Sequence, residues 1–122
     1  RFEKERESIP AIALTTDTSI ITAIGNDYGY EKIFSRQCEA LVNSNDVIFA
    51  ISTSGNSENV INGVKIGNQK KAKVISLIGK NSNKLKPLSD LCISIPSIST
   101  PRIQEVHRII LHVICKLIED EM

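Results

Sequence analysis

The chain has 122 residues, of which 41% are hydrophobic and 24% charged, a composition typical of one globular domain and not of a disordered segment. Fifteen basic and fourteen acidic residues leave a net charge of +1, and aromatic residues make up only 4%. Nucleic acid and anionic membranes are therefore not expected as partners, because both are bound mainly through clustered positive charge or aromatic stacking. The most apolar stretch, 109–118, is too short to span a membrane.

Cysteine usage points to a reducing compartment. Cys38, Cys92 and Cys115 are odd in number and lie far apart, without a Cys-x-x-Cys pair. We therefore expect reduced, mostly buried thiols in a cytoplasmic protein. No signal-peptide pattern precedes the first predicted element, and because the sequence starts at Arg1 we expect it to lack its natural start.

Apolar runs and helical periodicities alternate along the chain. Strands are expected at 11–14, 47–51, 73–78 and 91–95, and helices at 19–24, 31–42, 58–71 and 102–121. The run 47–51 is apolar throughout, which suits a strand buried on both faces of a parallel sheet. The alternation predicts an α/β fold, a three-layer sandwich with a mainly parallel sheet, formed by a single domain over 1–122.

A hydroxyl-rich segment, Ser-Thr-Ser-Gly-Asn-Ser at 52–57, follows a predicted strand and precedes a predicted helix. Open α/β sheets bind ligands at such strand ends, and a helix N-terminus attracts anions. Hydroxyl groups add neutral donors for phosphate oxygens, here from Ser52, Thr53, Ser54 and Ser57. The segment predicts a phosphate site for a small neutral ligand, because it lacks the Gly-Lys-Ser/Thr of nucleotide triphosphatases. An ordinary capped connection is the alternative.

The last predicted helix carries a second polar group. At about 100° per residue, Gln104, Arg108 and His112 form a stripe that drifts slowly around the helix. His112 stands among isoleucine, leucine and valine residues. An imidazole there is either a core or interface residue or a partly desolvated group suited to proton transfer or metal binding. His107 is expected to be exposed beside Arg108.

Apolar side chains cover more than one side of the same helix. One stripe consists of Ile103, Val106, Ile110, Val113 and Leu117, and the remaining apolar residues are Ile109, Leu111, Ile114 and Ile118. A helix on the surface of a lone domain shows a narrower apolar stripe. We therefore expect a neighbour on this helix, either residues N-terminal to Arg1 or another subunit.

Five segments together carry a family resemblance that runs over nearly the whole chain. They are 11–19, 23–29, 34–37, 51–60 and 102–107, and they include the motifs Gly-Asn-Asp-Tyr-Gly, Ser-Thr-Ser-Gly-Asn-Ser and Arg-Ile-Gln-Glu-Val-His. The serine motif resembles the wider sugar isomerase (SIS) domain family, whose fold is flavodoxin-like. The other two motifs, with His112 beyond them, resemble its phosphoheptose isomerase branch.

The resemblance implies an aldose–ketose isomerase that converts sedoheptulose 7-phosphate to D-glycero-D-manno-heptose 7-phosphate. Its product would supply the heptose of lipopolysaccharide or related surface glycans. The implied site residues are Ser52, Thr53, Ser54 and Ser57 for the phosphate, Asn26, Asp27 and Gln104 for the sugar, and His112 for catalysis. In zinc-containing members Gln104 and His112 match two of the metal ligands. The resemblance further implies a cytoplasmic homotetramer.

The chain departs from the family pattern at its N-terminal side. The pattern also contains a Gly-Asn-Gly-Gly-Ser loop and a helix that carries a histidine and the glutamate base, and neither is found in these 122 residues. We therefore expect the domain to be incomplete before Arg1 and this chain alone to be inactive. Pro101 also departs from the pattern, at a position where a helix tolerates proline.

A non-catalytic role is the competing hypothesis. Related SIS proteins sense sugar phosphates or act as tetrameric scaffolds for the bacterial replication initiator, and they share much of this motif set. A shared fold does not decide function. The presence of both Gln104 and His112 favours the enzyme.

Overall fold

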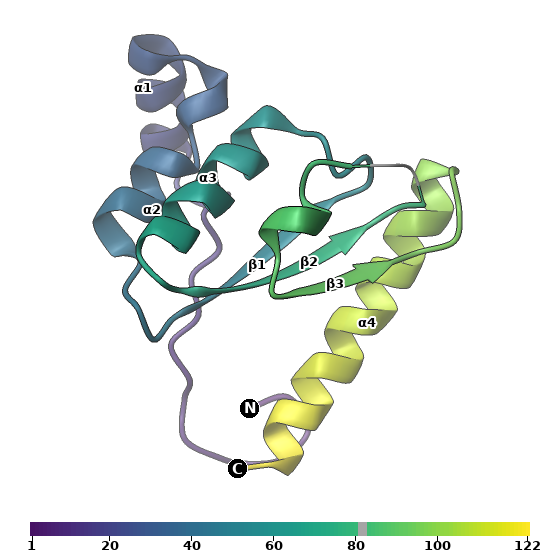
Figure 1. The fold of residues 1–122 in the computed structure, drawn as a ribbon. Coiled ribbons are helices and arrows are strands. Elements are labelled where there is room, and N and C mark those ends of the chain that lie inside the picture. The colour runs from purple at the N-terminus through teal and green to yellow at the C-terminus, as the bar shows by residue number, and fades with distance from the viewer. Residues whose placement is uncertain (81–82) are drawn as a thin grey trace.

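The computed structural model of the chain describes residues 1–80 and 83–122 (Figure 1). In this part of the chain three strands, β1 (Val47–Ser52), β2 (Lys73–Ile78) and β3 (Leu91–Ser94), form a parallel sheet in the order β1-β2-β3. The helices are α1 (Thr18–Tyr28), α2 (Ser35–Leu41), α3 (Glu58–Gln69) and α4 (Thr100–Asp120), with 3-10 helices η1 (Tyr30–Lys32) and η2 (Lys86–Leu88). The predicted strand 73–78 is confirmed with the same ends, and the strands 47–51 and 91–95 and the helices 58–71 and 102–121 are confirmed with ends shifted by one or two residues.

Helices lie on both sides of the sheet, so the α/β fold with a parallel sheet is confirmed. In Figure 1, α2 and α3 lie on one side of the strands and α4 crosses the other side, running from the carboxyl ends of β2 and β3 toward the chain termini. The buried core between the sheet and α3 consists of Ala50, Ile61, Val64, Val74, Ile78 and Leu85. Because β2 is the central strand, its side chains from Val74 onward are mostly buried.

Strand β1 is buried on one face only, so the expectation of a strand covered on both faces is wrong for this chain. Ala50 faces the core and is 4% exposed, whereas Phe49 and Ile51 on the opposite face are 37% and 43% exposed. Strand β1 pairs with β2 on one side, and the described residues place no strand on its other side. Its outer edge and one apolar face therefore remain open in the described chain.

The predicted strand at 11–14 is also wrong. These residues lie in an irregular segment that leads to α1, and Ala11, Ile12 and Ala13 are exposed. Their apolar run acquires no partner strand, and the chain turns back where the Thr16 N–H donates to the Ala13 carbonyl at 3.2 Å. A strand needs a neighbouring strand with which its backbone forms hydrogen bonds, and the composition of a short apolar run does not specify one.

Two helix predictions have different boundaries in the structure. Helix α1 continues through Gly25 and Asn26 and ends at Gly29, whose φ of 92° suits glycine. The predicted helix 31–42 is divided into η1 and α2. The periodic apolar positions therefore located a helical segment but did not reveal the break near Ile33.

The three cysteines are free. Cys38 is buried, but Cys92 is partly exposed and Cys115 is exposed, so the expectation of mostly buried thiols is wrong for this chain. Burial raises the pKa of the Cys38 thiol, with Lys70 opposing this and Glu39 adding to it. No helix in the described part of the chain is long and apolar enough to cross a membrane.

Candidate functional site

The segment 52–57, which we call the serine loop, connects β1 to α3 as predicted. Ser52 is the last residue of β1 and Ser57 is the N-cap of α3. The loop therefore lies at the carboxyl edge of the parallel sheet and at a helix N-terminus. This position combines the two features that favour anion binding in α/β proteins.

Hydrogen bonds within the serine loop gather its hydroxyl groups. The Ser52 Oγ lies 3.0 Å from the Ser57 Oγ and 3.5 Å from the Ser54 Oγ. The Gly55 N–H donates to the Ser52 Oγ at 3.1 Å, and the Asn56 N–H donates to the Ser54 Oγ at the same distance. The Ser57 hydroxyl makes no capping bond to α3. Ser57 therefore occupies the N-cap position without capping α3 through its side chain, and three hydroxyls share one small region.

Glycine at two positions allows the loop to pack closely. Gly55 has a φ of 65°, and a Cβ there would lie 2.4 Å from the Asn83 Cβ. Gly79, directly after β2, donates its N–H to the Thr53 carbonyl at 3.0 Å, and a Cβ there would lie 2.5 Å from that oxygen. Only glycine fits both positions without displacement. The backbone of the serine loop is thereby fixed by its neighbours before any ligand binds.

The first turn of α4 lies beside this loop. A Cβ on Gly79 would also lie 2.6 Å from the Ile103 Cδ1, so Ile103 and the Thr53 carbonyl contact the same glycine. Gln104, the next residue, is exposed. The structure therefore brings the start of α4 to the serine loop, and that both contribute to one site stays a prediction.

His112 lies two turns farther along α4 and is exposed. Eight residues of helix correspond to about 12 Å along the axis. Gln104 and His112 can therefore contact the same ligand only if that ligand lies between the two side chains. The interpretation of His112 as a core histidine is wrong for this chain, because the residue is exposed; its interpretation as an interface histidine stays a prediction. The one ring contact of His112 in the described chain is with Phe2, whose ring centroid is 5.7 Å away at an interplanar angle of 66°.

His107, which we expected to be exposed, is buried with 3% exposure. Its Nε2 lies 3.3 Å from the carbonyl oxygen of Ile78 at the end of β2, and its Nδ1 has no partner in the described chain. His107 therefore supports the strand end that precedes Gly79 and hence the serine loop. His107 follows the buried Ile103 by four residues, a spacing that places both on the same face of α4. This spacing is the sequence signal that could have predicted the burial of His107.

Asn26 and Asp27 lie apart from these elements. They are exposed on the last turns of α1, where the Asn26 Nδ2 donates to the Asp27 Oδ1 at 2.8 Å. In Figure 1, α1 lies at the upper left, above α2, whereas α4 begins at the right of the view. The structure of this single chain does not bring them to the serine loop, and their role as sugar contacts stays a prediction.

The described residues contain no group of three or more His, Cys, Asp or Glu side chains that could hold a metal ion. Gln104 and His112 offer two donors, whereas zinc sites in proteins use three or four protein ligands. The described chain therefore does not form a zinc site by itself.

Comparison with known proteins decides the family. Residues 1–79 match the SIS domain family. The chain belongs to the SIS domain family. It is 50% identical over all its 122 residues to the phosphoheptose isomerase of Aliarcobacter butzleri and 52% identical over 120 residues to that of Nitratiruptor sp.. The chain spans 65% and 64% of the lengths of these two SIS relatives.

Solved structures of SIS proteins agree with this assignment. A phosphoheptose isomerase from Francisella tularensis superimposes with a TM-score of 0.93 at 41% identity, covering 98% of this chain and 64% of that one. A phosphoheptose isomerase from Neisseria gonorrhoeae superimposes with a TM-score of 0.85 at 45% identity, covering 88% and 61%. The fold described above is therefore that of the corresponding part of these enzymes.

Proposed function

We propose that the protein containing this chain isomerises sedoheptulose 7-phosphate to D-glycero-D-manno-heptose 7-phosphate for surface-glycan heptose, including that of lipopolysaccharide. The observation that carries the proposal is the serine loop, where three hydroxyls gather at a helix N-terminus beside the helix that bears Gln104 and His112. Relatives about half identical in sequence bear the name of this enzyme.

The serine loop suits the phosphate end of the substrate. Its donors are hydroxyl and backbone N–H groups, so a phosphate dianion would be bound by neutral hydrogen bonds together with the dipole of α3. Such bonds to a charged acceptor contribute about 1.5–3 kcal/mol each. Fixing the phosphate would place the other end of the sugar along α4, where Gln104 and His112 project.

Isomerisation moves a proton between two neighbouring carbons through an enediol, and a second group exchanges a proton with the oxygens. We propose His112 as the group that exchanges protons with the sugar oxygens, because an imidazole can donate and accept protons near neutral pH. The base that removes the carbon-bound proton is proposed to lie N-terminal to Arg1, as the family resemblance implies. On this proposal residues 1–122 alone bind the phosphate but do not turn over the sugar.

Zinc and assembly form the second part of the proposal. Where zinc is bound, Gln104 and His112 would instead hold two positions of the ion, with its remaining ligands outside this chain, and the ion rather than the imidazole would act on the sugar oxygen by polarising it. A homotetramer in the cytoplasm would cover the exposed apolar side chains of α4, which include Ile109, Val113, Leu117 and Ile118. Metal analysis and light scattering on the full-length protein test these two points.

The decisive experiment incubates the full-length protein with sedoheptulose 7-phosphate and follows product formation by NMR. Product at a rate that depends on enzyme concentration supports the isomerase. Tight binding without turnover would instead support a SIS sugar-phosphate sensor or scaffold. Absence of both binding and turnover would overturn the proposal.

A further inference from the structure

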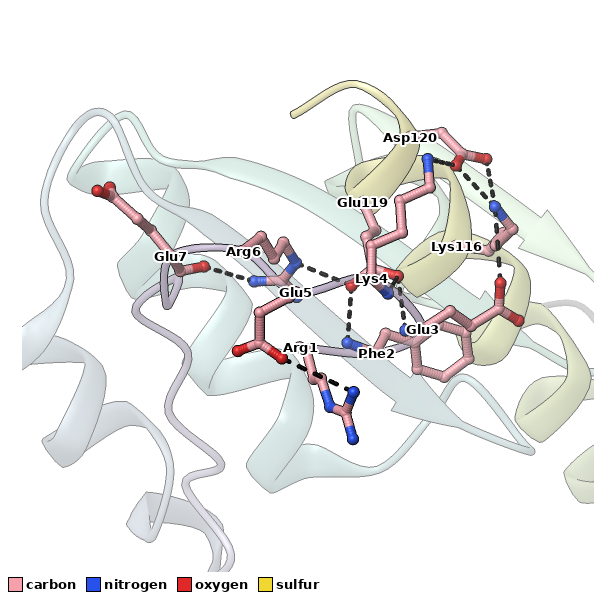
Figure 2. A network of polar contacts seen from close by, with 10 residues as sticks. All are labelled: Arg1, Phe2, Glu3, Lys4, Glu5, Arg6, Glu7, Lys116, Glu119 and Asp120. Atoms are coloured by element: carbon pink, nitrogen blue, oxygen red, sulfur yellow. Dashed lines mark hydrogen bonds and ion pairs between the residues drawn. The ribbon is translucent and has the colours of Figure 1, made fainter.

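A second polar cluster lies at the opposite end of α4 from the serine loop. The carboxylate of Glu119 accepts backbone N–H bonds from Phe2 at 2.7 Å, Glu3 at 2.6 Å and Lys4 at 2.8 Å (Figure 2). It also accepts a bond from the Arg6 Nε at 3.0 Å. Glu119 therefore holds the backbone of the N-terminal segment, residues 1–6, while Asp120 and Lys116 of α4 pair with the Lys4 and Glu3 side chains.

Glu119 is unusual because its side chain is fully buried, with 0% exposure, although it lies in the last turn of the helix. A buried carboxylate is costly unless donors satisfy its oxygens. Burial raises the pKa of Glu119, but the bonds from Phe2, Lys4, Glu3 and Arg6 outweigh this effect and lower the pKa to about 2. The carboxylate is therefore charged whenever the segment is docked at neutral pH.

The docked segment leads directly to His112. Phe2, whose N–H donates to Glu119, packs its ring against the imidazole in a T-shaped arrangement with the geometry given above. Such aromatic pairs favour one relative orientation of the two rings. The imidazole is otherwise exposed, and the described chain offers it no hydrogen-bond partner, so this ring is the feature that restricts its orientation.

We propose that Glu119 is a positioning residue for His112: by holding the backbone of the N-terminal segment it sets the Phe2 ring against the imidazole. The role of His112 rests on the proposed function, whereas the chain of contacts from Glu119 through Phe2 does not. The hydrogen-bond partners of the Glu119 carboxylate in the described chain are backbone N–H groups of the segment and Arg6, and not the imidazole. Glu119 acts through another residue, across 117 positions of sequence.

Two variants break this chain of contacts at different points. Glu119→Gln replaces one acceptor oxygen by an NH₂ group that faces the same donors, and so releases the segment. Phe2→Leu keeps the segment docked but removes the ring. Asp120→Asn is the matched control, because it also removes one negative charge from the end of α4 but binds only the exposed Lys4 and Lys116 ammonium groups.

The first readout is a double-mutant cycle on kcat in the full-length protein. Displacement of a catalytic group by about 1 Å can lower a rate a hundredfold, so we expect each single variant to lower kcat by about tenfold with little change in KM. The double variant should lose no more than either single variant, because both act through one contact. Asp120→Asn should retain wild-type kcat. Multiplicative losses, or unchanged kcat in both variants, would overturn the proposal.

The second readout needs no turnover. In protein labelled at histidine, the ring protons of His112 should lose the ring-current shift of Phe2 in both variants, while the buried His107 serves as an internal reference. If Glu119→Gln does not fold, Phe2→Leu still tests the contact, since Phe2 is 38% exposed and tolerates replacement. Unchanged His112 resonances would refute positioning even where the wild-type protein is active. An inactive wild-type protein would instead refute the proposed function. The His112 resonances of the two variants would then still test whether Glu119 positions the imidazole through Phe2.

Discussion

In the serine loop, hydroxyls and backbone groups between β1 and α3 hold one another in place, whereas on α4 the side chains of Gln104 and His112 project from an exposed face. The loop is complete within the chain because its partners are close in sequence or lie on the next strand. The side chains of Gln104 and His112 are exposed, and the one ring contact that the described chain gives His112 comes from the N-terminal segment. Ligand binding and chemistry are therefore expected to be separable.

The double variant Ser54→Ala and Ser57→Ala removes two hydroxyls of the serine loop without changing α4. Each lost hydroxyl should cost about 1.5–3 kcal/mol of binding free energy toward the sugar phosphate, because the acceptor is charged. Titration calorimetry with sedoheptulose 7-phosphate measures the loss, and unchanged thermal unfolding shows that the fold is retained. Ser44→Ala, in the exposed turn before β1, is the matched control. Wild-type affinity in the double variant would contradict the phosphate assignment.

His112→Asn tests the exposed polar side chains of α4. Removing a group that exchanges protons with the substrate should lower kcat by about a hundredfold or more. Substrate affinity should change little, because the serine loop lies about two helical turns away along α4. Cys115→Ser, also exposed on α4, should leave kcat unchanged. A His112→Asn protein that retains most of its kcat would remove this residue from the proposed chemistry.

Gly79→Ala disturbs the contact between the two regions. The new methyl group would meet the Thr53 carbonyl and Ile103 at distances that real Cβ atoms do not adopt, so the loop and α4 must move apart. Overpacking of this kind costs about 1–3 kcal/mol of stability. By contrast, the new methyl group of Gly25→Ala on α1 would make an ordinary van der Waals contact, 3.9 Å from the Ile33 Cγ2, and should raise stability by about 0.5–1 kcal/mol. Thermal unfolding of both variants measures the difference.

The sequence predicted the serine loop and its neighbouring strands because the signals there are local. An apolar run, a hydroxyl-rich turn and a periodic helix follow one another within 47–71, and the structure joins them as expected. The same local logic predicted a strand at 11–14 that the structure lacks, because strand formation depends on a partner that the segment itself cannot specify.

The burial of α4 shows a second limit of the sequence. Apolar residues around the helix predicted more than one covered face, but the structure buries His107 and Glu119 and leaves Val113 and Leu117 exposed. Two polar residues are inside because specific partners lie opposite them: the Ile78 carbonyl for His107, and the N-terminal segment for Glu119. Hydropathy alone does not contain that information, since the partner of Glu119 is separated from it by more than a hundred residues.

The smallest expected effect is the response of the two regions to acid. Glu119 has a pKa near 2 in the folded protein and an ordinary value of 4.5, so its contribution to stability is fully present above about pH 4.5 and is lost as the pH falls toward 2. The amide resonances of Phe2, Glu3 and Lys4 should therefore titrate together with a midpoint near pH 2 and stay constant between pH 5 and 8.

The serine loop should not follow this titration, because its donors are hydroxyl and amide groups without a titratable proton in that range. Amide resonances of Gly55 and Asn56 recorded in the same spectra provide the internal comparison. The carboxylate of Asp120, whose pKa is lowered by hydrogen bonds from Lys116 and Lys4, contacts the N-terminal segment only at the Lys4 side chain. In Glu119→Gln the change of the Phe2 and Glu3 amide resonances near pH 2 should therefore disappear. If this change persists, it is caused by Asp120 instead.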